Sequence, residues 1–133
     1  MPYLEKLTIA NQDIDSLESL SSLTKLTSLD LSGSRFSPDD LTVIAELPAL
    51  TELSMVECGL STIEKLSGAK SLTYLNLGEN TIRNLDVLSS MTTLTELNLQ
   101  HNAVTSLDAL DGLSNLQTLD VSYNALTTLA PVS

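Results

Sequence analysis

The chain has 133 residues, enough for one domain, and its 42% hydrophobic content excludes an intrinsically disordered protein. Aromatic residues make up only 3% and tryptophan is absent, so leucine must fill most of the core. A net charge of -11 repels the phosphates of nucleic acids and the headgroups of anionic membranes. The composition therefore argues against nucleic-acid binding and favours a basic or mixed-charge protein partner.

The chain contains one cysteine, Cys58, which cannot form an internal disulfide. We therefore expect a cytoplasmic protein, although many bacterial surface proteins also lack disulfides. No apolar run is long enough to cross a bilayer, so membrane insertion is not expected. The opening residues, MPYLEKLTIANQ, do not have the pattern of a signal peptide. A surface or secreted location stays open if a signal has been removed.

One unit of sequence recurs six times along the chain. The units start 22 or 24 residues apart, at Leu4, Leu26, Leu50, Leu72, Leu94 and Leu116. Apolar residues recur at the first, fourth, sixth, eleventh and fourteenth places of a unit. In the fourth unit these are Leu72, Leu75, Leu77, Ile82 and Leu85. The period predicts a single domain, residues 1–133, built from stacked repeats.

Each unit begins with alternating apolar and polar residues, as in YLNLG and ELNLQ, which predicts a short strand with one buried face. A strand that recurs after a compact return segment makes parallel neighbours. No unit can bury its leucines alone, so the stack itself forms the core. We therefore predict an α/β repeat, a solenoid with short parallel strands on its concave face.

The second unit is two residues longer than the others and contains a helix signal. Ser37 is a capping residue, Pro38 suits the first helical position, and acidic residues follow. The pattern predicts a convex-face helix from about Pro38 to Glu46, either a local length variant or a specialised binding element. The other returns, such as SLESLSSL and SLDALDGL, predict turns or 3₁₀ segments.

The pattern L-x-x-L-x-L-x-x-N-x-[IL]-x-x-L-x-x-L-x-x-L resembles the leucine-rich repeat family. Its period is similar to that of the 22-residue class, found in phosphatase regulators and bacterial internalin-type surface proteins. The resemblance covers residues 4–132. It implies a solenoid that recognises proteins and has no catalytic activity.

The ninth place of each unit corresponds to the family's inward-pointing asparagine, whose amide bonds the buried turn backbone. The residues at this place are Gln12, Ser34, Cys58, Asn80, Asn102 and Asn124. The resemblance implies a ladder of hydrogen bonds, weaker in the first two units, where glutamine and serine depart from the pattern. Because the family accepts cysteine here, Cys58 is interpreted as a buried ladder residue and not as a nucleophile.

His101, the only histidine, lies at an eighth place between Glu79 and Tyr123 of the neighbouring units. Zinc needs further nitrogen or sulfur ligands, and a catalytic histidine needs a nucleophile in a closed pocket. We therefore expect no catalytic, cofactor or metal site and an exposed His101. Glu57 and Glu79 occupy adjacent eighth places, as a solvated acidic pair or a weak calcium site.

The third and fifth places of each unit face outward from the strands, so the binding surface is expected there and at the eighth places. We predict contact with a protein partner through Glu52, Tyr74, Asn76, Glu96, Asn98, His101 and Tyr123, because tyrosines dominate interface energetics. The hypothesis is a non-enzymatic interaction module. Its alternatives are a bacterial adhesin of internalin type and the recognition arm of a larger enzyme whose catalytic domain is absent from this sequence.

The predicted repeats begin and end without the polar caps that solenoids normally carry. We expect one or both caps to be missing because the chain is a fragment. The alternative is that the uncapped ends pair, so the oligomeric state is either a monomer or an end-to-end dimer.

Overall fold

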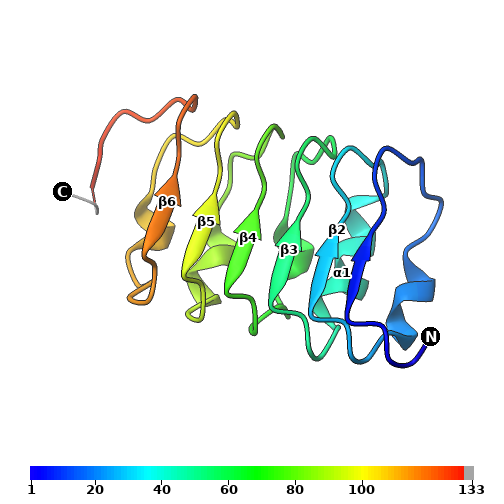
Figure 1. Cartoon of the computed structure of the whole chain (residues 1–133). Coiled ribbons are helices and arrows are strands. Elements are labelled where there is room, and N and C mark those ends of the chain that lie inside the picture. The colour runs from blue at the N-terminus through cyan, green and yellow to red at the C-terminus, as the bar shows by residue number, and fades with distance from the viewer. Residues whose placement is uncertain (131–133) are drawn as a thin grey trace.

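A computed structural model describes residues 1–130 as a single stack with one parallel sheet along one side (Figure 1). The strands are adjacent in chain order: β1 (Lys6–Thr8), β2 (Ser28–Asp30), β3 (Glu52–Ser54), β4 (Tyr74–Asn76), β5 (Glu96–Asn98) and β6 (Thr118–Asp120). Their register follows the repeat without a slip, so that Tyr74 pairs with Glu52 on one side and Glu96 on the other. The predicted solenoid is confirmed.

Each strand has three residues, and only its middle side chain points into the stack. In the four inner strands this leucine is buried, as at Leu53 and Leu75, and the flanking residues are half-buried or exposed. The corresponding Leu7 and Leu119 of the terminal strands are only partly buried. The core therefore depends on a neighbouring unit at each side, as expected for a solenoid.

The return segments cover the opposite face of the core (Figure 1). They are 3₁₀ helices and one short α-helix: η1 (Glu18–Ser22), η2 (Pro38–Asp40), α1 (Leu41–Ala45), η3 (Glu64–Leu66), η4 (Asp86–Ser90) and η5 (Asp108–Leu110). Each 3₁₀ helix other than η2 buries one leucine, at Leu20, Leu66, Leu88 or Leu110. None of the helices in residues 1–130 has the length and apolarity needed to traverse a bilayer. Residues 131–133 lie outside the described residues.

The helix of the second unit begins as predicted but is not uniform. The Ser37 hydroxyl accepts a hydrogen bond from the N–H of Asp39 at 3.3 Å, which caps the first turn. That turn is the 3₁₀ segment η2; the α-helix proper is α1, and Glu46 is its C-cap. A tightened first turn is common at helix termini, and here only two turns are present. The prediction of one α-helix over Pro38–Glu46 is therefore corrected to a 3₁₀ turn followed by α1.

Asp40 has a second role that links the first two units. Its Oδ2 accepts a hydrogen bond from the N–H of Leu17 at 3.1 Å, at the start of η1. Leu17 is buried, so its N–H would otherwise have no access to water. The longer return of the second unit thus caps the return of the first.

We predict that Asp40→Ala lowers the free energy of unfolding by about 1 kcal/mol, because the N–H of Leu17 loses its acceptor. Asp40→Asn keeps an acceptor oxygen and serves as the matched control. Urea unfolding followed by circular dichroism measures both. Equal stability of wild type and Asp40→Ala would show that this link contributes nothing.

Candidate functional site

The ninth-place asparagines hold the turns that follow the strands. Asn80 is buried, and its Oδ1 accepts hydrogen bonds from the N–H groups of Cys58 and Leu60 in the preceding unit, both at 3.0 Å. Its Nδ2 donates to three carbonyl oxygens at 2.9–3.1 Å, those of Met55, Leu77 and Gly78. One amide thus ties the turn of its own unit to the turn before it.

Asn102 and Asn124 repeat this arrangement. The Oδ1 atoms accept from the N–H groups of Ile82 and Val104, both at 2.9 Å. Each Nδ2 donates to three carbonyls, one of them in the preceding unit, which for Asn124 is that of Leu99 at 2.8 Å. These side chains therefore belong to the fold and are not available to a partner.

The three ninth-place residues that are not asparagine bond fewer groups. The Cys58 thiol donates to the carbonyl of Leu31 at 3.2 Å, and the Ser34 hydroxyl accepts from the N–H of Gln12 at 3.1 Å. Gln12 itself is exposed, and its side-chain amide donates to Ala10 within its own turn. Burial raises the pKa of the Cys58 thiol, so the reactive thiolate is disfavoured.

A second hydrogen-bonded column lies at the fifth places, where each strand ends. The side-chain oxygens of Asp30, Asn76, Asn98 and Asp120 each accept from the backbone N–H two residues later, at 2.9–3.0 Å. This is the local bond that aspartate and asparagine form in turns. The predicted contact residues Asn76 and Asn98 therefore have one polar atom committed to ending their strands. The sequence signal was the recurrence of Asp or Asn at this place.

The backbone of every eighth-place residue is left-handed. The φ angles are 59° at Asn11, 79° at Gly33, 56° at Glu57, 59° at Glu79, 56° at His101 and 58° at Tyr123. Asparagine and glycine adopt this conformation readily, whereas glutamate, histidine and tyrosine do so at a cost of about 1–2 kcal/mol each. The last four eighth places therefore present long side chains from a strained backbone.

His101 is exposed, as predicted, and contacts both of its neighbours in the column. Its Nε2 lies 3.8 Å from Glu79 Oε1, and its ring stacks on Tyr123 with centroids 4.2 Å apart and planes 8° apart. Glu79, His101 and Tyr123 thus form a continuous row, the turn row, along the edge of the sheet where the strands end. Tyr123 is 74% exposed, so most of its ring is free for contact.

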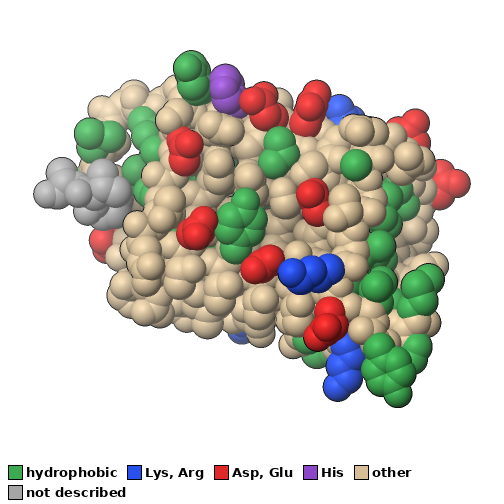
Figure 2. Space-filling view, in the orientation of Figure 1, with side chains coloured by type: hydrophobic (Ala, Val, Ile, Leu, Met, Phe, Trp, Pro, Cys, Tyr) green, Lys and Arg blue, Asp and Glu red, His purple; other side chains and the backbone are tan. Residues whose placement is uncertain are grey.

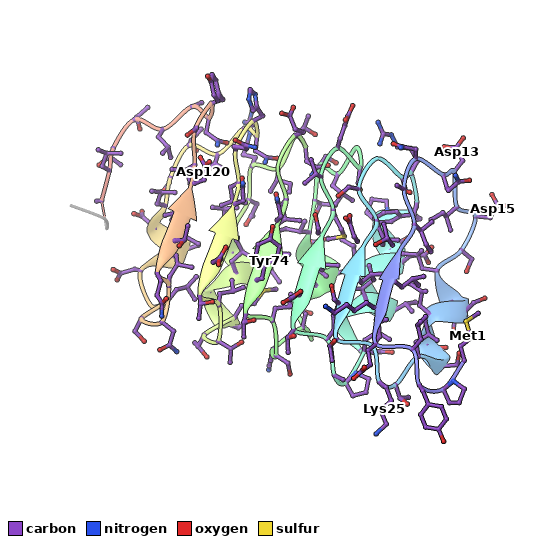
Figure 3. The ribbon with its side chains drawn as sticks, viewed as in Figure 1. Met1, Asp13, Asp15, Lys25, Tyr74 and Asp120 are labelled. Carbon is purple, nitrogen blue, oxygen red and sulfur yellow. The ribbon has the colours of Figure 1, made fainter. Side chains whose placement is uncertain are left out.

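Tyr74 lies apart from this row, on the open face of the sheet (Figure 3). It is half-buried, and its hydroxyl accepts a hydrogen bond from Asn76 Nδ2 at 3.3 Å. Glu52 and Glu96 flank it in register. The predicted residues therefore form two groups: the strand face, with Glu52, Tyr74, Asn76, Glu96 and Asn98, and the turn row, with His101 and Tyr123.

The strand face also includes Asp30 and Asp120, which were not among the predicted contact residues. Hydrogen bonds from Ser122, first from its side chain and then from its N–H, lower the pKa of Asp120. Figure 2 shows carboxylates distributed over this face and few basic side chains. Within residues 1–130, no three His, Cys, Asp or Glu side chains converge as metal ligands would, so the calcium reading of Glu57 and Glu79 gains no support.

Family models for leucine-rich repeats match three segments of the chain. "Leucine Rich repeat" matches residues 22–45, "Leucine rich repeat" residues 48–104, and "Leucine Rich repeats (2 copies)" residues 92–133. Among curated protein sequences, none matches the chain significantly.

Solved structures of bacterial proteins are similar to most of the chain. Internalin C2 of Listeria monocytogenes is 28% identical, with a TM-score of 0.89 over 96% of this chain and 55% of its own. Internalin F of the same species is 27% identical, with a TM-score of 0.81 over 98% of this chain and 45% of its own. A leucine-rich repeat protein of Leptospira interrogans is 27% identical, with a TM-score of 0.83 over 92% of this chain and 32% of its own. The chain thus spans little more than half of these proteins at most.

We predict that Asn80→Ala lowers the free energy of unfolding by about 3 kcal/mol, because two N–H groups and three carbonyls inside the stack lose their partner. Gln12→Ala, at the same place of the first unit, should change it by less than about 0.5 kcal/mol. Chemical denaturation of both variants measures the difference. Similar losses in the two variants would contradict the unequal ladder.

We predict that Glu57→Gly raises the free energy of unfolding by about 0.5–1 kcal/mol, because relief of the left-handed strain exceeds the added entropy of glycine in the unfolded chain. Glu52→Gly, five residues earlier in β3, should lower it by about the same amount, since glycine weakens a strand. Thermal and urea unfolding compare the two. Destabilisation by both substitutions would show that the eighth-place backbone stores no strain.

Proposed function

Because this chain belongs to the leucine-rich repeat family, we propose that it binds a protein partner through the strand face and the adjoining turn row. Leucine-rich repeat domains are typically protein-interaction modules, and internalin-type folds are generally non-catalytic. The partner contacts are those of Tyr74, Glu52 and Glu96 on the strand face, with His101 and Tyr123 at its edge.

The observation that carries this proposal is Tyr74 on the open sheet face. Its ring lies in the middle of six strands, between Glu52 and Glu96 in register. A half-buried tyrosine is held in place by its surroundings, so it loses little conformational entropy when a partner covers it. Tyr123 adds a second, more exposed ring two units further on.

A second candidate function, bacterial surface adhesion of internalin type, is favoured by the similarity to internalins C2 and F of Listeria monocytogenes. The cytoplasmic alternative rests on the single cysteine, Cys58, which is free and buried. The complete gene distinguishes the two settings: a secretion signal or a wall anchor supports adhesion, and their absence from it supports an intracellular regulator.

The proposal is tested by affinity capture with variants that separate the two groups. The strand-face variant is Tyr74→Ala with Glu96→Lys, and the turn-row variant is His101→Ala with Tyr123→Ala. A control variant, Tyr3→Ala with Glu64→Lys, makes the same kinds of change at exposed positions outside both groups. Circular dichroism confirms that all variants fold alike.

We expect a partner from bacterial lysate or host-cell surfaces to bind wild type and the control variant and to be lost with the strand-face variant. Loss with the turn-row variant as well would extend the interface to the edge of the sheet. A partner that all three variants retain would place binding on another surface and overturn the proposal.

A further inference from the structure

Two hollows on the strand face share Tyr74 as a common wall. The early hollow, about 320 Å³, lies over β2, β3 and β4 and includes Asp30 and Glu52. The late hollow, about 170 Å³, lies over β4, β5 and β6 and includes Glu96 and Asp120. Each hollow therefore has Tyr74, one glutamate and one aspartate among its lining residues.

The two acid pairs are arranged symmetrically about β4. On each side the glutamate occupies the third place of the adjacent strand, β3 or β5, and pairs with Tyr74. The aspartate occupies the fifth place of the next strand outward, β2 or β6. In each pair the glutamate and the aspartate are diagonal neighbours in the sheet, so one long side chain inserted between them can reach both.

Among the described residues, none of these four carboxylates forms an ion pair. The single ion pair in residues 1–130 joins His101 and Glu79, outside both hollows. The third and fifth columns contain one basic residue, Lys6 on β1, whose register partner Ser28 lines the early hollow. The aspartates are oriented by the hydrogen bonds that Oδ1 of each accepts from the N–H of Ser32 or Ser122.

A cationic side chain fits each hollow better than a metal ion does. Within residues 1–130 no group of three acidic ligands converges, whereas a guanidinium or ammonium group needs only one or two carboxylates. Tyr74 adds an aromatic ring beside both positions, which attracts a cation over its face. Glu52 then contacts one cation and Glu96 the other, each from the strand next to Tyr74.

The spacing of the hollows indicates what connects the two cations. Their centres lie over β3 and β5, two strand spacings or about 10 Å apart. In a polyproline II segment, residues three apart lie on the same side and are separated by about 9 Å. A segment that crosses the strands in this conformation places its first and fourth side chains in the two hollows.

We propose that the strand face recognises a protein segment with two basic side chains three residues apart, seated on either side of Tyr74. This inference rests on the proposed function and adds the chemical class of the protein partner. The segment lies across the strands in an extended conformation, with Glu52 and Asp30 around one cation and Glu96 and Asp120 around the other.

The test uses capped peptides in ¹H–¹⁵N NMR titrations of the whole chain at low salt. The probe contains Arg-Pro-Pro-Arg between glycines. One control peptide places the two arginines next to each other with the same composition, and a second replaces the last arginine by glutamine. We expect the spaced peptide to bind about fivefold more tightly than either control, with shifts centred on β3 to β5.

Four variants show whether the hollows are responsible for binding. Glu52→Gln with Glu96→Gln should weaken binding of the spaced peptide about fivefold. Glu18→Gln with Glu64→Gln removes the same charge from the convex face and should change it less than about twofold. Tyr74→Ala should abolish the preference for the spaced peptide, whereas Tyr74→Phe keeps the ring and should retain it.

The inference is overturned if the adjacent-arginine peptide binds equally well, if both charge variants weaken binding alike, or if no peptide binds. None of these results contradicts the proposed function, which the capture experiment tests separately. A partner lost with the strand-face variant while no peptide binds would show that the face binds a protein by other chemistry.

Discussion

The backbone of the turn after each strand must be hydrogen-bonded inside the stack, and the rest of the structure depends on how this is done. An unpaired buried N–H or carbonyl costs about 1–3 kcal/mol, and a turn every 22 residues exposes several to the core. Asn80, Asn102 and Asn124 each bond groups in two successive units. These bonds join successive units, and the regular register of the strands aligns the surface columns.

Most of the architecture could be predicted because two patterns in each unit, one in the strand and one in the return, indicate which residues face inward. The alternation around Leu75 fixes the strand, and the spacing to Ile82 and Leu85 fixes the return. The helix start at Ser37 and Pro38 was also visible, because capping is local chemistry. Its first turn became 3₁₀ because so short a helix leaves little to favour regular α geometry over the tighter turn.

The sequence did not show that the expected contact residues would divide into the strand face and the turn row. Periodicity indicates which side of the chain a residue faces, but it does not give the path of the turn. Tyr74 and Tyr123 occupy different places of their units, and the left-handed residue at the eighth place turns the chain away from the sheet. The side-chain bonds of Asn76 and Asn98 depend on the same path. Asp30 and Asp120 were expected on the outward face as fifth-place residues, but only the hollows beside Tyr74 group each of them with a glutamate.

The acidic residues fall into two classes, one that stabilises the fold and one that does not. Those in the first turns of the 3₁₀ helices, such as Glu64 and Asp86, lie near N–H groups that have no intrahelical partner, where negative charge is favourable. Glu52 and Glu96 lie in strands, where acidic residues are disfavoured, and within residues 1–130 they form no ion pair that would compensate. Their mutual repulsion also opposes the compact state. The fold alone does not explain these two carboxylates, and the proposed contact with another molecule would do so, since complementary charge on that molecule orients and accelerates the encounter.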